Sequence, residues 1–458
     1  MKALILAAGR GERLKEVTNG KPKALTPVAG VPLLHRTLDS LKEMGVTSVH
    51  IVIGYRGREI VRALGKEYRG LRINYLKNPK WKKGNLYSLL AAEGHLDEDF
   101  LLLMSDHIFD PRIVRHLISS RRDCALTLAV DRGEATSEDT KVLESGGKIV
   151  DIGKDIGEYN CIDTGIFLCS PEIFRYAREA AEKGNGQLSD CIRLAAADGR
   201  ARVFDITKIP SYLPKMRREV GVYWVDIDTP EDLKKAKKLL VQSAGKGASD
   251  LMAHYVHRHI EDRLVYHLSD TRITPNQLTI ATNIVAYSAT ALFLLGFLLP
   301  ASILTLVVGI MDGLDGKLAR VRGRASKLGA LEHPFDLLFE FSWLIALSIY
   351  LSGTWGSLPL ELCAVSLAFI AFYRLCYDQF RRTMGRSLDD YGDFERKFRR
   401  IAGRRNLYNL HILAWILLGR PFYSLVTILG HAALTACVYA IRAGTHMRRA
   451  DLGEASGS

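Results

Sequence analysis

Two aspartates three residues apart end an apolar stretch in the second half of the chain. Asp312 and Asp315 are followed by Gly316, and Ala319 and Arg320 come one helical turn later. Residues three apart lie on one face of a helix, so both carboxylates would face the same way. Carboxylates at the end of a membrane-length apolar run need a cation, and Mg²⁺ binds carboxylate and phosphate oxygens together. The pattern predicts a metal and phosphate site, in which the glycine leaves room for the ligand and the guanidinium holds an anion.

The following apolar segment offers the remaining groups of such a site. Glu332 and Asp336 are four residues apart, so they share a helix face.

These residues resemble the signature of the CDP-alcohol phosphotransferases, Asp312-x2-Asp315-Gly316-x2-Ala319-Arg320-x8-Gly329. The resemblance covers residues 270–445 and includes Thr274-Pro-Asn-Gln-Leu-Thr279 before the first apolar span. It implies transfer of a phospho-alcohol from a CDP-alcohol to an acceptor hydroxyl, with release of CMP. It also implies Mg²⁺ or Mn²⁺ as cofactor, a homodimer through the membrane domain, and contact of the CDP group with Gly316, Ala319, Arg320 and Gly329. This chain departs from the family at two expected aspartates, where His333 and Leu337 stand instead, while Glu332 and Asp336 stand one residue earlier in each case. The resemblance then implies that either Glu332 or His333 completes the metal site, with Asp336 as a further ligand. It also implies that Asp336 or His333 accepts the proton of the attacking hydroxyl.

A second group of candidates lies at the N-terminus, where a buried strand leads into a glycine loop. The group consists of Leu6, Ala8, Gly9, Gly11, Arg13 and, ten residues further on, Lys23. Glycines let the backbone approach a nucleotide, and its N–H groups then face the phosphates. The two cations would offset the charge that develops on pyrophosphate.

This loop resembles that of the sugar nucleotidyltransferases, and two more segments match that family. The resemblance implies a catalytic Mg²⁺ held by Asp106 and by Asp226, with Asp228 as the next choice for the second ligand. Gly84 and Asn85 are similar to the base-binding segment of the cytidylyltransferase branch. Asn160 and Asp163-Thr-Gly165 would then face the sugar or polyol.

The order of apolar runs predicts two domains of different class. Residues 1–244 alternate buried strands with charged helices, which indicates an α/β doubly wound nucleotidyltransferase-like domain. Residues 245–270 form a linker with an amphipathic juxtamembrane helix, and 446–458 a polar tail. Residues 271–445 are predicted to form an all-α membrane domain with six transmembrane helices, at about 277–298, 300–313, 330–352, 356–377, 405–420 and 423–442.

The distribution of charge predicts how the chain is oriented in the membrane and which kinds of molecule it binds. The formal net charge is +13, and its arginines gather in the segments after the second and fourth spans. Basic loops stay on the cytoplasmic side, so a cell-membrane protein with both termini and the α/β domain in the cytoplasm is predicted. The positive charge favours phosphate compounds and membrane lipid as partners. Nucleic acid is not expected, because no RNA- or DNA-binding motif is present.

Three functions remain open. The first is a bifunctional enzyme whose N-terminal domain makes a CDP-alcohol from CTP and a phosphorylated polyol such as inositol-1-phosphate. This two-domain arrangement resembles the archaeal enzymes that fuse an inositol-1-phosphate cytidylyltransferase to a di-myo-inositol phosphate phosphate synthase. The second keeps the membrane transferase, for phospholipid or polyol phosphate synthesis, but gives it a non-catalytic nucleotide-binding domain and a lipid or glycerol phosphate acceptor. The third, a transporter, is disfavoured because the acidic residues lie near the ends of the spans.

Overall fold

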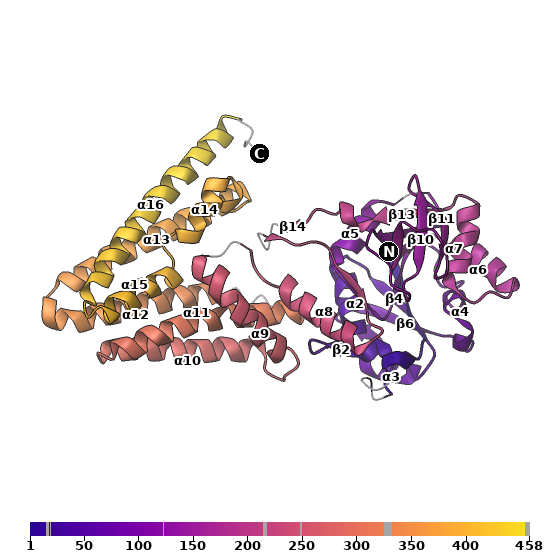
Figure 1. Ribbon diagram of the computed structural model, residues 1–458, viewed down its shortest axis with the longest axis horizontal. Helices are drawn as coiled ribbons and strands as arrows, with labels where there is room; N and C mark the ends of the chain where they lie inside the picture. The colour runs from indigo at the N-terminus through magenta and orange to yellow at the C-terminus, as the bar shows by residue number, and fades with distance from the viewer. Residues whose placement is uncertain are drawn as a thin grey trace. The chain divides into compact units, whose positions relative to one another are not determined.

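The computed structural model describes residues 1–14, 18, 20–121, 123–213, 218–247, 250–324 and 332–453. The chain divides into two compact units (Figure 1). The first comprises Met1–Ser211 and Val220–Leu240, and the second comprises Tyr212–Glu219 and Val241–Ser458. The limits given above for the linker and the tail stay predictions, although the last helix continues to Asp451, past residue 445.

A ten-stranded sheet forms the centre of the first unit, in the order β10-β11-β13-β9-β12-β7-β1-β4-β6-β5. Its strands are β1 (Lys2–Ala7), β4 (Ser48–Ile53), β5 (Glu67–Tyr68), β6 (Leu71–Lys77), β7 (Phe100–Met104), β9 (Leu126–Asp131), β10 (Lys141–Ser145), β11 (Lys148–Gly153), β12 (Cys161–Cys169) and β13 (Ala201–Asp205). Strands β1, β4, β6 and β7 are parallel, as a doubly wound sheet requires. The other half is mixed, because β12 runs antiparallel to β7 and β9, and β10 and β11 form a hairpin.

Both faces of this sheet are covered, because its strands are apolar on both sides. In β1, Leu4 and Leu6 pack into one core, while Ala3 and Ile5 pack into the other. The first core is closed by α4 (Leu86–Leu90), α6 (Ile173–Glu182) and α7 (Leu188–Ala197). The second is closed by α2 (Leu33–Glu43), α3 (Gly57–Leu64) and α5 (Pro111–Ser119). Burial on both faces is typical of parallel strands in α/β proteins.

A short antiparallel pair outside the main sheet brings distant parts of the first unit together. Strand β8 (His107–Phe109) pairs with β16 (Trp224–Asp226), and α8 (Pro230–Ser243) follows soon after. This pairing places the segment that closes the unit beside the end of β7, where ligands bind in open α/β sheets.

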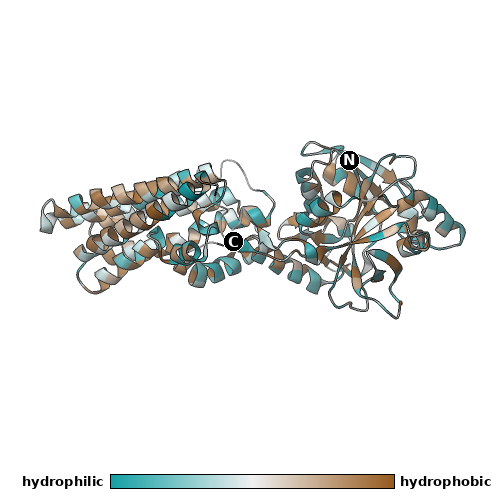
Figure 2. Ribbon diagram, turned by 90° about the horizontal axis from the view of Figure 1, so that it is seen from above, coloured by the Kyte–Doolittle hydropathy of each residue, from teal (hydrophilic) through white to brown (hydrophobic). Residues whose placement is uncertain are grey.

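The described part of the second unit is helical apart from a short β-hairpin, β14 (Tyr212–Leu213) and β15 (Arg218–Glu219). It begins with η5 (Ala253–His257) and α9 (Arg258–Leu268), in the predicted juxtamembrane segment. The remaining helices are α10 (Pro275–Leu294), α11 (Leu298–Val321), α12 (Glu332–Trp355), α13 (Leu358–Met384), α14 (Asp393–Ile401), α15 (Arg405–Leu417) and α16 (Phe422–Asp451). Figure 2 shows hydrophobic residues along most of the long helices.

Five helices among the described residues are long and apolar enough to cross a membrane, rather than the six predicted: α10, α11, α12, α13 and α16. The expected fifth span, 405–420, corresponds to α15, which has 13 residues. At 1.5 Å per residue it is about 20 Å long, short of the roughly 30 Å hydrocarbon core. Gly419, in the left-handed conformation with φ 69°, lies in the turn after it.

Candidate active sites

Three carboxylates meet one ammonium group in the first unit. Lys23 lies in η2 (Lys23–Leu25), and its Nζ atom is 2.7 Å from Asp106 Oδ2 and 2.5 Å from Asp228 Oδ1. Asp226 Oδ1 lies 3.7 Å from the same nitrogen. The lysine side chain is 9% exposed. The structure therefore brings together four predicted residues that are up to 205 positions apart in the chain.

The glycine loop allows this approach. Gly11 has a φ of 64°, and a Cβ atom there would lie 2.7 Å from Lys23 Cβ. Glycine is thus required for both the backbone conformation and the space. Leu6 and Ala8 are buried at the end of β1, and Gly9 is exposed after them.

Arg13 lies beside the carboxylate cluster but is itself open to solvent. It follows the loop in η1 (Glu12–Leu14) and pairs with Glu138 at 2.8 Å and Asp228 at 3.2 Å. Glu138 was not predicted from the sequence, because its segment carries no recognisable pattern. The Glu138 carboxylate and hydrogen bond raise the pKa of the arginine, which stays cationic at any physiological pH. A permanent, solvent-exposed cation at this edge can meet the phosphates of a nucleotide.

Neighbouring charges shift the pKa values of Lys23 and Asp226. Burial lowers the pKa of Lys23, but Asp106 and Asp226 outweigh it, and the pKa lies above its ordinary value. Burial raises the pKa of Asp226, but His107 and Lys23 outweigh it and bring the pKa well below its usual range. The lysine is therefore an ammonium ion and the aspartate a carboxylate at neutral pH, as a cation site requires.

His107 is a member of this site that the sequence reasoning missed. Among the described His, Cys, Asp and Glu side chains, Asp106, His107 and Asp226 form the one group of three whose ligand atoms all lie within 4.8 Å of one another. Burial lowers the pKa of the imidazole, but Asp226 and Asp106 outweigh it and raise the pKa to about 9. Its position directly after Asp106 was the available signal. The nearby Asp163 is half-buried, and its loss of contact with water raises its pKa to about 6.

Gly84 and Asn85 have a structural task in this unit. Gly84 has a φ of 120°, and a Cβ atom there would lie 2.1 Å from Gly186 O. Asn85 Oδ1 accepts a 2.7 Å hydrogen bond from the N–H of Leu188. Together they hold the start of α4 against the start of α7. A role in binding the base stays a prediction.

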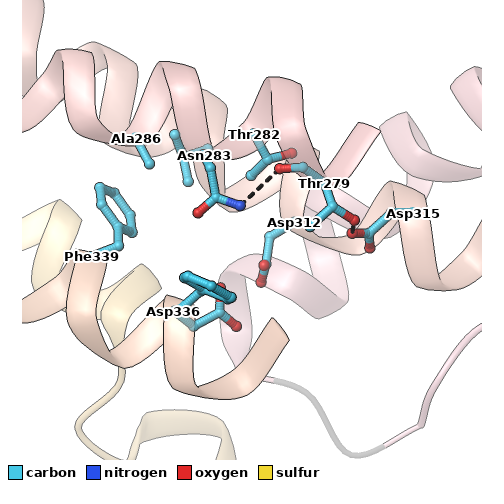
Figure 3. A pocket seen from close by; sticks show the side chains of 10 residues that line it. Thr279, Thr282, Asn283, Ala286, Asp312, Asp315, Asp336 and Phe339 are labelled. Atoms are coloured by element: carbon cyan, nitrogen blue, oxygen red, sulfur yellow. Dashed lines mark hydrogen bonds between the residues drawn. The ribbon is translucent and has the colours of Figure 1, made fainter. Parts of the chain in front are cut away.

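The second site lies in the helical unit, where Asp312 on α11 faces Asp336 on α12 (Figure 3). Arg405, the first residue of α15, donates to Asp336 Oδ1 at 3.0 Å and to Asp312 Oδ2. Its side chain is 10% exposed. The sequence placed Arg405 only among many basic residues, because nothing in its spacing marks it.

Asp315 lies at the other end of the same pocket. It is buried and accepts hydrogen bonds from the Thr279 hydroxyl and from the Gly316 N–H. Asn283 donates to the backbone oxygen of Thr279 at 2.9 Å, which Figure 3 marks. The pocket is lined by Thr279, Thr282, Asn283, Ala286, Val308, Asp312, Asp315, Phe335, Asp336 and Phe339.

The remaining predicted residues of this site have different outcomes. Asp336 lines the pocket. Leu337, which stands where the family pattern has an aspartate, is not among the described lining residues. Glu332 and His333 belong to the first turn of α12, but their side chains lie outside the described part of the structure. Gly329 also lies outside the described residues.

The opposite face of α11 is fixed to the segment that precedes the membrane helices. Arg320 Nε donates to the backbone oxygen of Ala244 at 2.7 Å. Lys317, 1% exposed, pairs with Asp262 of α9. Gly316 and Ala319 are half-buried on the same helix. The signature helix therefore presents its aspartates to the pocket and its basic residues to the linker.

Both sites fit a divalent cation by the chemistry of their donors. In the first unit, Asp226 Oδ1 is buried and is without a hydrogen bond from any described residue. In the second, Asp312, Asp315 and Asp336 line one pocket with hard carboxylate oxygens, but their ligand atoms do not all lie within 4.8 Å of one another, so a bound cation would have to draw them together. Such donors suit Mg²⁺ and Mn²⁺.

Comparison with known proteins agrees with the division of the chain into two units, each with its own site. Residues 3–198 match the family model of the MobA-like NTP transferase domain, and residues 272–388 match that of CDP-alcohol phosphatidyltransferase. A protein of Aquifex aeolicus named bifunctional IPC transferase and DIPP synthase is 31% identical over 448 residues, which cover 96% of this chain and 97% of that one. A Thermococcus kodakarensis protein of the same name is 35% identical over 353 residues, which cover 76% of this chain and 75% of the relative.

Among solved structures, the inositol-1-phosphate CTP transferase from T. maritima is similar to this chain. The two are 28% identical, and the match covers 52% of this chain and 94% of that one with a TM-score of 0.44.

Proposed function

This chain belongs to the family of bifunctional IPC transferases and DIPP synthases, and we propose that its two sites make and use the same CDP-alcohol. It is a CDP-alcohol phosphotransferase with a cytidylyltransferase domain. The proposed polyol is inositol-1-phosphate, supported by the names of the relatives. The proposal that the first unit is catalytically active rests on the convergence of four side chains, those of Asp106, Asp226, Asp228 and Lys23.

In the first unit, a phosphate oxygen of inositol-1-phosphate attacks the α-phosphorus of CTP. The bond to the β-phosphate oxygen breaks, CDP-inositol forms and pyrophosphate leaves. Lys23 and Arg13 offset the charge that builds up on the leaving group. Asp106 and Asp226, with Asp228 beside them, would hold Mg²⁺ or Mn²⁺, which neutralises the triphosphate. Gly9 and Gly11 let the backbone N–H groups approach the phosphates.

In the second unit, the hydroxyl of an acceptor, itself a phosphorylated polyol, attacks the β-phosphorus of the CDP-alcohol. The bond to the bridging oxygen breaks, and CMP leaves. Asp336 takes the proton of the attacking hydroxyl, with His333 as the alternative. Asp312, Asp315, Asp336 and Glu332 would hold a divalent metal, which polarises the diphosphate. Gly316, Ala319 and Gly329 are proposed to contact the CDP group, and Arg320 would join them only by releasing the backbone oxygen of Ala244.

The proposal places the chain in the cell membrane. Its support is the five apolar helices together with the apolar side chains exposed on them, such as Ile280 and Ile284 of α10. With α15 as a sixth, incomplete span, the basic segments lie on the cytoplasmic side, as do both termini. Contact with membrane lipid and a homodimer through the membrane unit complete the proposal.

Two releases measured on one preparation test this scheme. With CTP and inositol-1-phosphate, the wild-type protein should release pyrophosphate, and with further inositol-1-phosphate it should release CMP. Lys23→Gln should lose the first release but keep the second when CDP-inositol is added. Asp315→Asn should show the reverse. If no phospho-polyol supports pyrophosphate release, the first unit is a non-catalytic nucleotide-binding domain joined to a membrane transferase. Lipid and glycerol phosphate acceptors are then compared for CMP release.

A further inference from the structure

His107 stands directly opposite Asp226 in the short pair of β8 and β16. The register pairs these two residues, so their side chains lie on the same face of the ribbon. Directly opposed residues of an antiparallel pair have Cβ atoms about 5 Å apart. The imidazole and the carboxylate are therefore neighbours because of the backbone, and the preceding residue Asp106 completes the group.

The imidazole ring is held in one orientation. Its Nδ1 atom lies 2.8 Å from the backbone oxygen of Thr164, and a carbonyl oxygen only accepts, so Nδ1 carries a hydrogen. Gly165, with a φ of 70°, provides the space for the ring, because a Cβ atom there would lie 2.2 Å from the His107 Cε1 atom. This hydrogen bond directs Nε2 at the two carboxylates, and a cation bound there would replace the proton that Nε2 carries at neutral pH in its absence. Histidines that bind metals usually donate their other ring N–H to a carbonyl or carboxylate in this way.

The distances between the donor atoms suit one shared ion. His107 Nε2 lies 3.5 Å from Asp226 Oδ1 and 3.7 Å from Asp106 Oδ1. Ligands of an octahedral ion with bonds of about 2.1 Å are about 3.0 Å apart when adjacent and about 4.2 Å apart when opposite. Each separation exceeds the adjacent value by about 0.5–0.7 Å, so a small inward movement of the side chains would bring the three donors onto one ion. The histidine itself is buried, 9% exposed, while its partners are partly open to solvent.

We propose that His107 is a third ligand of the cation in the first unit, together with Asp106 and Asp226. A nitrogen donor changes what this site selects, because Mg²⁺ prefers oxygen ligands whereas first-row transition ions accept imidazole. The site therefore prefers Mn²⁺ to Mg²⁺. The inference rests on the proposed cytidylyltransferase site but not on its turnover, since binding of the ion is observed without substrate.

Pulsed electron paramagnetic resonance of Mn²⁺ on the full-length protein in detergent tests the proposal. The wild-type protein should show coupling of the electron spin to an imidazole ¹⁴N nucleus, and protein with ¹⁵N-labelled histidine should show ¹⁵N coupling instead. His107→Gln should lose the coupling and weaken Mn²⁺ binding about tenfold or more, within the range seen when a metal site loses a supporting group. Its Mg²⁺ affinity should change less.

His333→Gln is the matched control, because that residue is the other histidine considered as a metal ligand. It should leave the nitrogen coupling unchanged. If the nitrogen coupling disappears in His333→Gln and persists in His107→Gln, the coupled histidine belongs to the membrane unit and the proposal is overturned. An absence of nitrogen coupling in the wild-type protein would overturn it as well. Pyrophosphate release is scored separately, so nitrogen coupling without turnover would refute the proposed activity and leave this ligand in place.

Discussion

Arg405 is the residue of the membrane site whose replacement gives the most informative result. Its guanidinium joins Asp312 and Asp336, and the three side chains are 10%, 23% and 24% exposed. Removing one partner of a buried ion pair costs roughly 3–5 kcal/mol, because the other charge is left without compensation. Since both carboxylates reach some solvent, we expect about 3 kcal/mol for Arg405→Gln without metal. For a unit of this size, that lowers the apparent unfolding temperature by about 6–12 °C.

The assay compares thermal unfolding of the purified protein in EDTA and in saturating Mn²⁺. A divalent ion supplies the charge that the substitution removes, so the loss in Arg405→Gln should shrink to less than half when Mn²⁺ is present. Arg374→Gln is the matched control, because Arg374 pairs with the fully buried Glu340 in the same helical unit, outside the pocket lining. Its loss should be the same in both conditions. Equal losses of Arg405→Gln in EDTA and Mn²⁺ would refute the idea that these carboxylates share a cation site.

Three further outcomes are expected. Lys23→Gln should slow pyrophosphate release by about 10²–10³-fold, the usual effect of losing a group that stabilises developing charge, in a coupled pyrophosphate assay. Gly165→Ala should destabilise the first unit by about 1–2 kcal/mol from the left-handed backbone alone, measured by thermal unfolding, whereas Gly157→Ala, with open space around it, should be nearly neutral. Glu332→Gln should reduce CMP release more than His333→Gln; the opposite order would make the histidine the ligand.

Local sequence patterns were sufficient to predict those parts of the structure that a single segment determines. The alternation of apolar strands and charged helices predicts the parallel half of the sheet, and the glycine pattern predicts a loop directly after the first strand. The antiparallel strand β12 and the pairing of β8 with β16 are not predictable in this way, since both depend on contacts between distant segments. His107 was missed for that reason. Its task follows from standing opposite Asp226, 119 positions further along the chain.

In the membrane site, prediction from the sequence is limited by the fixed spacing of the family pattern. The family pattern expects carboxylates at 333 and 337, yet the structure places Asp336 in the pocket, together with Phe335 and Phe339. A shift of one residue turns a helix by about 100°, so Leu337 is directed away whenever Asp336 faces the site. The helix period then assigns position 332, one turn earlier, to the same face as Asp336. The chain has kept the four-residue interval between its acidic residues and moved the pair by one position, so glutamate, not histidine, becomes the expected partner of Asp336.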